Sequence, residues 1–235
     1  GRYVCEHHDG RIALVDAFSR SCNAFFAQHA AAAGTEAMVA AATRLGLAEQ
    51  HLVDDLGTDQ ARAAGLPLSG PGTRRWYPQD LAFIGIGQGY ASASPVQIAT
   101  AYARVANGGR MIRPWLLEHR RPERAGIPLD PVLGRWSDVL REGARRVVTE
   151  GTARNVPLLR EIGAAGKTGT AEVDRRFADG RTVRTNNAWF VGYAPHDAPR
   201  YCAVVVIEGL PEGQYGGAVA GPPVAELLAE ALREQ

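Results

Sequence analysis

The segment whose residue types are best suited to binding or catalysis is residues 163–172, GAAGKTGTAE. It contains Lys167, the single lysine of the chain, followed by the hydroxyls of Thr168 and Thr170 on either side of Gly169. Small residues let another backbone approach closely, so a peptide can lie here as an added strand. A cation beside two hydroxyls suits a carboxylate at the end of that peptide. The alternative is a glycine-rich edge strand with an exposed lysine, and this string by itself does not decide between the two.

A second candidate element is the tripeptide Ser21-Cys22-Asn23, which lies between two stretches of helical spacing. A serine and an asparagine two residues apart are common by chance. Alone they are more typical of a helix N-cap or of a link between helices. Their significance therefore depends on the segments that accompany them.

Together these segments resemble the penicillin-binding protein transpeptidases, whose motifs are Ser-x-x-Lys, Ser-x-Asn and Lys-Thr-Gly. The resemblance is closest to class B enzymes of the elongation type and runs in order over nearly the whole chain. The further stretches that are similar to this family are residues 17–26, 86–90, 94–99, 106–109, 150–153 and 188–195.

The chain departs from the family pattern at the nucleophile. In the family this is the serine of Ser-x-x-Lys, some tens of residues before Ser-x-Asn, but here Ala164 stands three residues before Lys167. The chain therefore contains no Ser-x-x-Lys. Either the N-terminal segment with the nucleophile is absent from this sequence, or the protein is a truncated relative. The start at Gly1, without Met, favours the first.

The resemblance implies roles for the matching positions. Ser21 would pass a proton between nucleophile, base and leaving amine. Asn23 would hydrogen-bond the motif lysine of the missing segment and the substrate amide. Lys167 would hold positive potential and help to bind the substrate carboxylate. The substrate-binding strand would be Thr168, Gly169 and Thr170, with both hydroxyls near the carboxylate and the N–H of Thr170 as one oxyanion donor.

The reaction implied by the resemblance is acyl transfer through a covalent acyl-enzyme. The donor would be a D-Ala-D-Ala stem peptide of peptidoglycan, the acceptor an amine of a neighbouring peptide, and β-lactams would acylate the same serine. A hydrolase of the same fold, either a D,D-carboxypeptidase or a β-lactamase, remains an alternative because the motifs do not encode the acceptor. A non-catalytic binding module that has lost its nucleophile is the other.

The elements that must position these residues change character along the chain. Apolar spacing predicts helices on both sides of Ser21, at 36–45 after Gly34, and at 95–106 with Ser94 as N-cap. A short strand is expected at 111–117 and an amphipathic helix from Trp136 to Val148. Apolar runs at 188–194 and 201–207 predict a hairpin, and Pro222 and Pro223 begin a final helix with Val224, Leu227 and Leu228 on its apolar face.

These elements predict an α+β fold, a mixed α/β sandwich. The resemblance implies that this fold is of the serine β-lactamase and D,D-transpeptidase type. It would be one partial transpeptidase domain, with a mainly helical part at 1–130. An antiparallel sheet flanked by helices, including the C-terminal helix, would follow at 131–235. In this family, strands upstream of the serine helix pair with the strand at 201–207. That strand should therefore be an open edge, through which the fragment self-associates unless its N-terminal portion is supplied.

Composition narrows the function classes. Of 235 residues 46% are hydrophobic and 22% charged, which excludes a disordered chain, and the net charge of +1 gives no field that favours nucleic acid. We expect Arg74-Arg75, Arg120-Arg121 and Arg145-Arg146 to be solvated. No cofactor or metal is expected, because the cluster at residues 5–9 lacks further ligands at a fitting spacing. Of the three cysteines, Cys5 and Cys22 allow one disulfide, although buried thiols are the favoured interpretation.

No apolar run is long enough to span a bilayer. The family resemblance nevertheless implies an extracytoplasmic protein, at the periplasmic face of the bacterial inner membrane. There an N-terminal helix that is not in this chain would anchor it.

Overall fold

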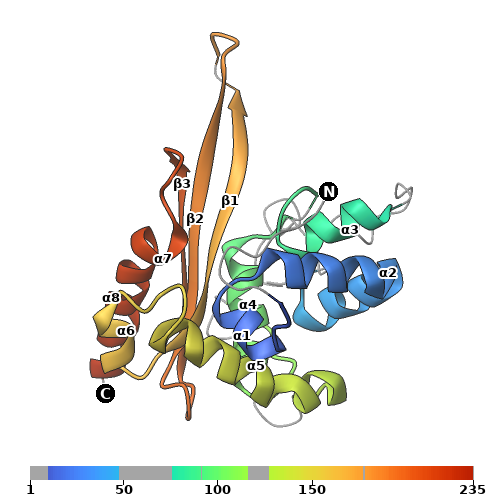
Figure 1. The fold of residues 1–235 in the computed structure, drawn as a ribbon. Coiled ribbons are helices and arrows are strands. Elements are labelled where there is room, and N and C mark those ends of the chain that lie inside the picture. Colours follow the sequence, from blue (N-terminus) through green and yellow to red (C-terminus); the bar gives the residue numbers. More distant parts are fainter. Residues whose placement is uncertain (1–9, 48–75, 91, 116–126, 177, 235) are drawn as a thin grey trace. The chain divides into compact units, whose positions relative to one another are not determined.

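A computed structural model describes residues 10–47, 76–90, 92–115, 127–176 and 178–234 (Figure 1). The chain divides into two compact units, one formed by Gly1–Ile12 with Cys22–Asp138 and the other by Ala13–Ser21 with Val139–Gln235. The elements in order are α1 (Leu14–Ser19), α2 (Asn23–Leu45), α3 (Pro78–Gly85), α4 (Pro95–Ala106), α5 (Pro131–Thr149), α6 (Pro157–Glu161), β1 (Ala165–Arg176), β2 (Thr182–Ala194), β3 (Tyr201–Leu210), α7 (Gly216–Val219) and α8 (Gly221–Arg233).

The first unit is helical in the part that the structure describes, as the sequence predicts. The predicted break at Gly34 is a kink inside α2, where φ is 80° and ψ is 172°. Ser94 caps α4 as predicted, because its hydroxyl accepts from the N–H of Gln97 at 3.2 Å. Arg104 on α4 is 1% exposed and donates to the carbonyls of Ile112 and Arg44, which fixes the segment after α4 against the end of α2.

The prediction of a strand at 111–117 is wrong for its described residues, 111–115. Only an isolated bridge between Arg110 and Leu129 forms next to this segment. The physical reason is that the carbonyl of Ile112 accepts from the Arg104 guanidinium, and Pro114 has no N–H to donate to a neighbouring strand. A backbone hydrogen bond, from the N–H of Met111 to the carbonyl of Pro128 at 2.9 Å, and the Arg104 side chain hold the segment, and no ladder of backbone hydrogen bonds forms along its described residues.

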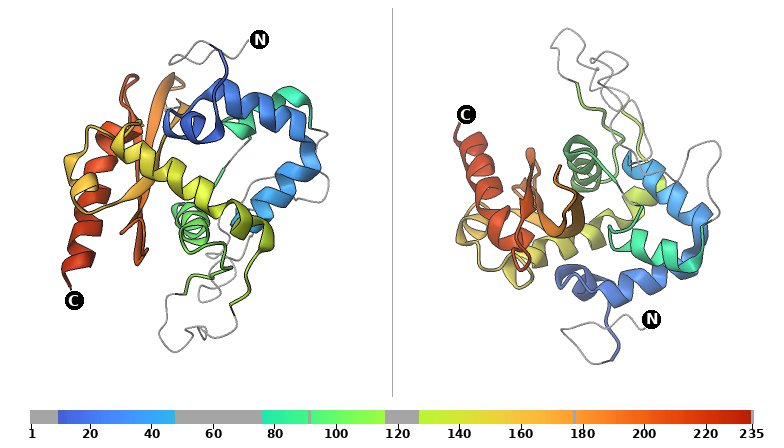
Figure 2. Two further views of the ribbon diagram at one scale, coloured as in Figure 1. Left: turned by 60° about the horizontal axis from the view of Figure 1, so that its bottom comes forward. Right: turned by 90° about the horizontal axis from the view of Figure 1, so that it is seen from above.

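The second unit contains an antiparallel sheet in the order β1-β2-β3. The predicted hairpin forms between β2 and β3, and the segment around Lys167 is the strand β1 that pairs with the other side of β2. Helix α8 packs on β3 and β2 (Figure 2). Its buried face consists of Val224, Ala225 and Leu228, whereas Leu227, predicted on the apolar face, is 53% exposed. Trp136 on α5, also predicted on an apolar face, is 50% exposed.

The core of this unit joins the end of α5, α6, β2 and α8. Its fully buried side chains include Val147, Leu159, Phe190, Val224 and Leu228. One face of β2 is thus covered by helices, so that the sheet is held rigidly where Lys167 lies, opposite Val191. A rigid strand can set the position of a side chain more narrowly than a loop can.

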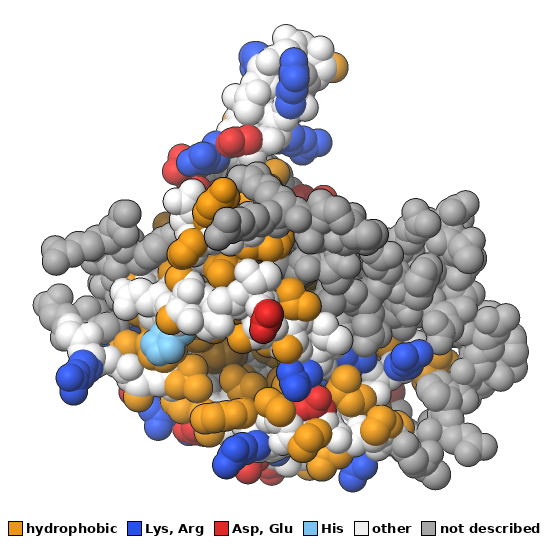
Figure 3. Space-filling model, turned by 90° about the vertical axis from the view of Figure 1, so that its right-hand side faces the viewer, with side chains coloured by type: hydrophobic (Ala, Val, Ile, Leu, Met, Phe, Trp, Pro, Cys, Tyr) orange, Lys and Arg blue, Asp and Glu red, His pale blue; other side chains and the backbone are white. Residues whose placement is uncertain are grey.

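Strands β1 and β2 extend beyond β3. Strand β3 pairs only with the part of β2 from Asn186 to Ala194. The remaining two-stranded ribbon projects from the sheet (Figure 1) and carries basic and acidic side chains (Figure 3). Arg184 on β2 pairs across the ribbon with Glu172 at 3.4 Å and Asp174 at 3.3 Å on β1. These cross-strand pairs explain why β2 begins at Thr182, earlier than the apolar run predicts.

β3 forms one edge of the sheet among the strands that the structure describes. The self-association of this edge stays a prediction. No helix among the described residues is long and apolar enough to cross a membrane. The cluster at residues 5–9 and the arginine pairs at 74–75 and 120–121 lie outside the described residues.

Candidate active site

Ser21 follows α1 in a strained backbone conformation. Its φ is 55°, and it is the one non-glycine residue with positive φ in the part of the chain that the structure describes. Serine rarely adopts this left-handed region, and such outliers persist only where surrounding contacts hold them. The N–H of Ser21 donates to the carbonyl of Phe18 at 3.2 Å, which ends α1. The sequence prediction that Ser21 lies between two helices is confirmed.

Lys167 on β1 contacts Ser21 although the two are 146 residues apart in the sequence. Its Nζ donates to Ser21 Oγ at 2.8 Å, to the carbonyl of Thr168 at 2.8 Å and, at the long limit of a hydrogen bond, to Thr168 Oγ1 at 3.5 Å. Burial lowers the pKa of Lys167 from 10.5 to about 8. The structure thus brings together two of the residues that the sequence analysis selected.

The two threonines after Lys167 are both hydrogen-bonded. The Thr168 and Thr152 hydroxyl oxygens are 2.7 Å apart, and either atom can be the donor. Thr170 Oγ1 accepts from the N–H of Gly216 at 3.1 Å. Gly169 between them pairs with Trp189 across the sheet.

Asn23 is the first residue of α2 and belongs to the helical unit. Its side chain is exposed. The neighbouring Cys22 is buried and Cys202 is half-buried, while Cys5 lies outside the described residues, so the disulfide stays a prediction. Burial raises the pKa of the Cys202 thiol to about 12.

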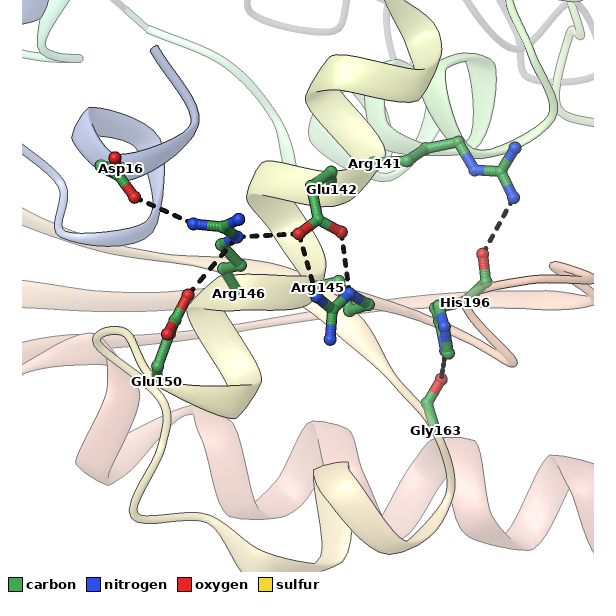
Figure 4. Close-up of polar contacts among 8 residues, drawn as sticks. All are labelled: Asp16, Arg141, Glu142, Arg145, Arg146, Glu150, Gly163 and His196. Atoms are coloured by element: carbon green, nitrogen blue, oxygen red, sulfur yellow. Dashed lines mark hydrogen bonds and ion pairs between the residues drawn. The ribbon is translucent and has the colours of Figure 1, made fainter. Parts of the chain in front are cut away.

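Contacts with α5 hold α1, and with it Ser21, in place. Arg146 Nη1 lies 3.0 Å from Asp16 Oδ1 on α1 (Figure 4). The Arg146 guanidinium also binds Glu142 at 2.7 Å and Glu150 at 3.4 Å. Hydrogen bonds from Arg145 and Arg146 lower the pKa of Glu142 to about 2. The pair Arg145-Arg146 is therefore part of an ion-pair network with carboxylates, not a patch left open for a polyanion.

Sequence reasoning missed two elements that position the Lys167 strand. Thr152, in the turn after α5, donates its N–H to the carbonyl of Ser19 at 3.3 Å as well as contacting Thr168. Gly216 lies so close to the sheet that a Cβ would be 2.2 Å from the carbonyl oxygen of Gly169 and 2.3 Å from that of Trp189. In the sequence, residues 150–153 are marked only by their resemblance to the family. The local signal for Thr152 is its hydroxyl next to a glycine, Gly151.

This geometry supports two kinds of chemistry. A hydroxyl hydrogen-bonded to a lysine amine can exchange a proton with a reacting group. A cation with two neighbouring hydroxyls can bind a carboxylate through charge-assisted hydrogen bonds. The described residues therefore carry the groups that proton transfer and anion binding require.

Comparisons with known proteins identify the family of this chain. The family model for the penicillin binding protein transpeptidase domain matches residues 4–229. The chain is 30% identical over 200 residues to stage V sporulation protein D of Bacillus subtilis, covering 77% of this chain and 30% of that protein. It is 28% identical to the peptidoglycan D,D-transpeptidase PbpA of Mycolicibacterium smegmatis, covering 95% of this chain and 44% of that one. The chain thus spans less than half the length of these relatives.

Solved structures give the same result for the fold. The transpeptidase domain of Burkholderia pseudomallei penicillin-binding protein 3 matches with a TM-score of 0.75 and 26% identity, covering 97% of this chain and 66% of that one. Pseudomonas aeruginosa PBP2, in its complex with WCK 5153, matches with a TM-score of 0.73 and 30% identity, covering 97% and 50%. The α+β fold of the D,D-transpeptidase type and the resemblance to class B are confirmed. This chain belongs to the penicillin-binding protein transpeptidase domain family.

Proposed function

We propose that the protein is a peptidoglycan D,D-transpeptidase that cross-links D-Ala-D-Ala stem peptides through a serine acyl-enzyme. The observation that carries the proposal is the contact of Lys167 Nζ with Ser21 Oγ at 2.8 Å, beside the Thr168 hydroxyl. The family match supports it. The same site would bind β-lactams, and the protein would work outside the cytoplasm of a bacterium.

The nucleophilic serine would come from a Ser-x-x-Lys segment outside this chain, because these 235 residues contain none. The nucleophile gives its proton to the lysine of the same Ser-x-x-Lys segment as it attacks the penultimate D-Ala carbonyl. As the peptide bond breaks and the acyl-enzyme forms, Ser21 donates its proton to the amine of the leaving terminal D-Ala and takes up the proton held by that lysine, while Lys167 keeps the Ser21 hydroxyl oriented. The acceptor amine then attacks the acyl-enzyme, loses a proton along the same route in reverse, and restores the free serine. Asn23 would contact the motif lysine and the substrate amide. The positive charge of Lys167 and the hydroxyls of Thr168 and Thr170 would bind the terminal carboxylate.

Labelling with a fluorescent penicillin tests this proposal. We expect the intact protein to form one stable, stoichiometric adduct on the serine of an upstream Ser-x-x-Lys, whereas residues 1–235 alone form none. Peptide mapping identifies the labelled serine. An adduct on any serine of residues 1–235, or no adduct on the intact protein, contradicts the proposal.

The acceptor is tested separately with a stem peptide and a D-amino acid amine. A transpeptidase forms the exchanged peptide. A carboxypeptidase releases D-Ala with water as the acceptor and gives no exchange product, and a β-lactamase turns over the penicillin steadily without a lasting adduct.

A further inference from the structure

Thr152 connects three segments of the second unit. Its N–H donates to the carbonyl of Ser19 at the end of α1, and its hydroxyl lies 2.7 Å from that of Thr168 on β1. Its carbonyl oxygen faces Gly217 on α7, where a Cβ would be 2.4 Å away. The preceding residue, Gly151, is equally close to α1, since a Cβ there would lie 2.3 Å from the Ser19 carbonyl oxygen. The backbone that carries the Thr152 hydroxyl is therefore fixed on several sides.

The contact between the Thr152 and Thr168 hydroxyls determines where the Thr168 proton can point. A hydroxyl has two acceptor lone pairs and a single proton. Lys167 Nζ donates to Thr168 Oγ1 at 3.5 Å, which occupies one lone pair. If Thr152 donates to the other, both are filled, and the Thr168 proton must point to a third atom. That arrangement turns Thr168 into a pure donor toward an anion.

We propose that Thr152 is a positioning residue for the carboxylate of the ligand, acting through Thr168. When the carboxylate arrives, Thr152 donates to Thr168 and Thr168 donates to the carboxylate, so that each hydrogen bond polarises the next. Thr152 is exposed and lies outside the buried core, so its hydroxyl is not required to fill space. The role rests on the proposed function, because it requires a ligand that carries a carboxylate.

The test uses the intact protein and compares a penicillin that has a free carboxylate with its methyl ester. Thr152→Val keeps the shape of the side chain and removes the donor. We expect it to lower the second-order acylation rate for the free acid by up to about tenfold, the upper end of the scale for a hydrogen bond between neutral groups. The rate for the ester should change less than about twofold, since the ester is a weaker acceptor without charge. Thr152→Ser should restore most of the free-acid rate.

Two further variants sharpen the result. Thr168→Val should remove the sensitivity to Thr152→Val, because the second residue acts only through the first. Thr182→Val, at an exposed threonine at the start of β2 in the ribbon, is the matched control and should alter neither rate.

The outcomes separate this inference from the proposed function. Equal losses for acid and ester in Thr152→Val, with no rescue by Thr152→Ser, would mean a merely structural role and overturn the inference. Unchanged rates for both ligands would overturn it as well. A wild-type protein that takes neither ligand would refute the proposed function itself, and this inference with it.

Discussion

Two cations of the second unit, Arg146 and Lys167, contact the segment that contains Asp16 and Ser21. Arg146 is surrounded by carboxylates, whereas Lys167 is hydrogen-bonded to neutral oxygens. Arg146 on α5 reaches Asp16 and is also bound to Glu142 and Glu150. Its hydrogen bond with Glu142 raises the pKa of Arg146 above its ordinary value. Lys167 reaches Ser21 and is otherwise bound to a carbonyl and a hydroxyl of Thr168. Burial lowers the pKa of Lys167 to about 8.

The difference distinguishes a cation that is paired with carboxylates from one whose hydrogen bonds, among the described residues, go to neutral oxygens. The Arg146 charge is balanced by carboxylates within the protein. Among the residues that the structure describes, no carboxylate forms an ion pair with Lys167, so its charge is solvated only by neutral oxygens. A partly desolvated cation of this kind gains most from an anion that enters the site. The comparison therefore predicts large effects at Lys167 and small ones in the network around Arg146.

The largest effect is expected when Lys167 is replaced by Ala in the intact protein. Loss of one charge-assisted contact in a transition state costs about 2–4 kcal/mol, or a factor of roughly 30 to 1,000 in the acylation rate. Lys167→Arg should also be slow, because a planar guanidinium differs in reach and geometry from a compact ammonium. Stopped-flow measurement of β-lactam acylation checks both variants. Unchanged rates in Lys167→Ala would make the Lys-Thr-Gly segment purely structural.

The next effect concerns the packing behind the Lys167 strand. Gly216→Ala places a methyl group against two backbone oxygens that lie 2.2 and 2.3 Å from the Cβ position, so the strand or α7 must move. Overpacking of this kind costs about 1–3 kcal/mol of stability. Chemical denaturation measures it. Gly134→Ala is the matched control, because its nearest neighbour would be 3.5 Å away, and a similar loss there would show that the contact at Gly216 is not the cause.

The third prediction is a pH dependence from Lys167. Between about pH 8 and 10.5 the unfolded chain binds the lysine proton and the folded chain does not. Stability from this group therefore rises with pH across that window. The affinity for a carboxylate should instead fall as the pH rises, since the positive charge of Lys167 is lost above about pH 8. Difference titrations of wild type against Lys167→Met isolate this group from Cys202, whose thiol pKa is raised to about 12. A difference in stability between the two proteins that does not change with pH would contradict the lowered pKa of Lys167.

The smallest effect is expected for Glu142→Gln. The folded pKa of Glu142 is about 2, so its contribution is present above pH 4.5 and is lost as the pH falls from 4.5 to 2. The pair is largely solvent-accessible, which limits the change in Tm at neutral pH to about 1–4 °C. Thermal melts at pH 7 and pH 3 measure it, with Glu226→Gln on the exposed side of α8 as control. A drop in Tm much larger than about 4 °C would contradict the prediction that changes around Arg146 have small effects and changes at Lys167 large ones.

Local patterns predicted much of the fold. The apolar runs around Pro195 and Pro199 predicted the β2–β3 hairpin, and Ser94 predicted the start of α4, because each depends on residues close in sequence. The contact between Ser21 and Lys167 has no local signal, and the family resemblance implied only that both residues belong to the site. The failure at 111–115 has the same origin. Whether an apolar segment becomes a strand depends on its partners, and here Arg104, a buried side chain on α4, took the carbonyl of Ile112.

The site residues show the same limit. Lys167 was conspicuous as a single lysine, but its lowered pKa follows from burial by segments far away in the sequence. Thr152 and Gly216 could not be selected from residue type, since threonines and glycines are common. Their significance arises only where three chain segments meet. The roles of all the candidate site residues stay predictions, namely those of Ser21, Asn23, Lys167, Thr168, Gly169 and Thr170.

The two glycines of α7 also restrict how this protein can evolve. Every amino-acid change at a glycine codon adds a side chain, and at Gly216 and Gly217 the first carbon of that side chain meets backbone oxygens 2.2 and 2.4 Å away. Neighbouring side chains cannot relieve such a collision by changing rotamer, because backbone atoms cause it. If an antibiotic selects variants of this site, missense steps at these two glycines begin with a loss of stability that steps on open surfaces avoid.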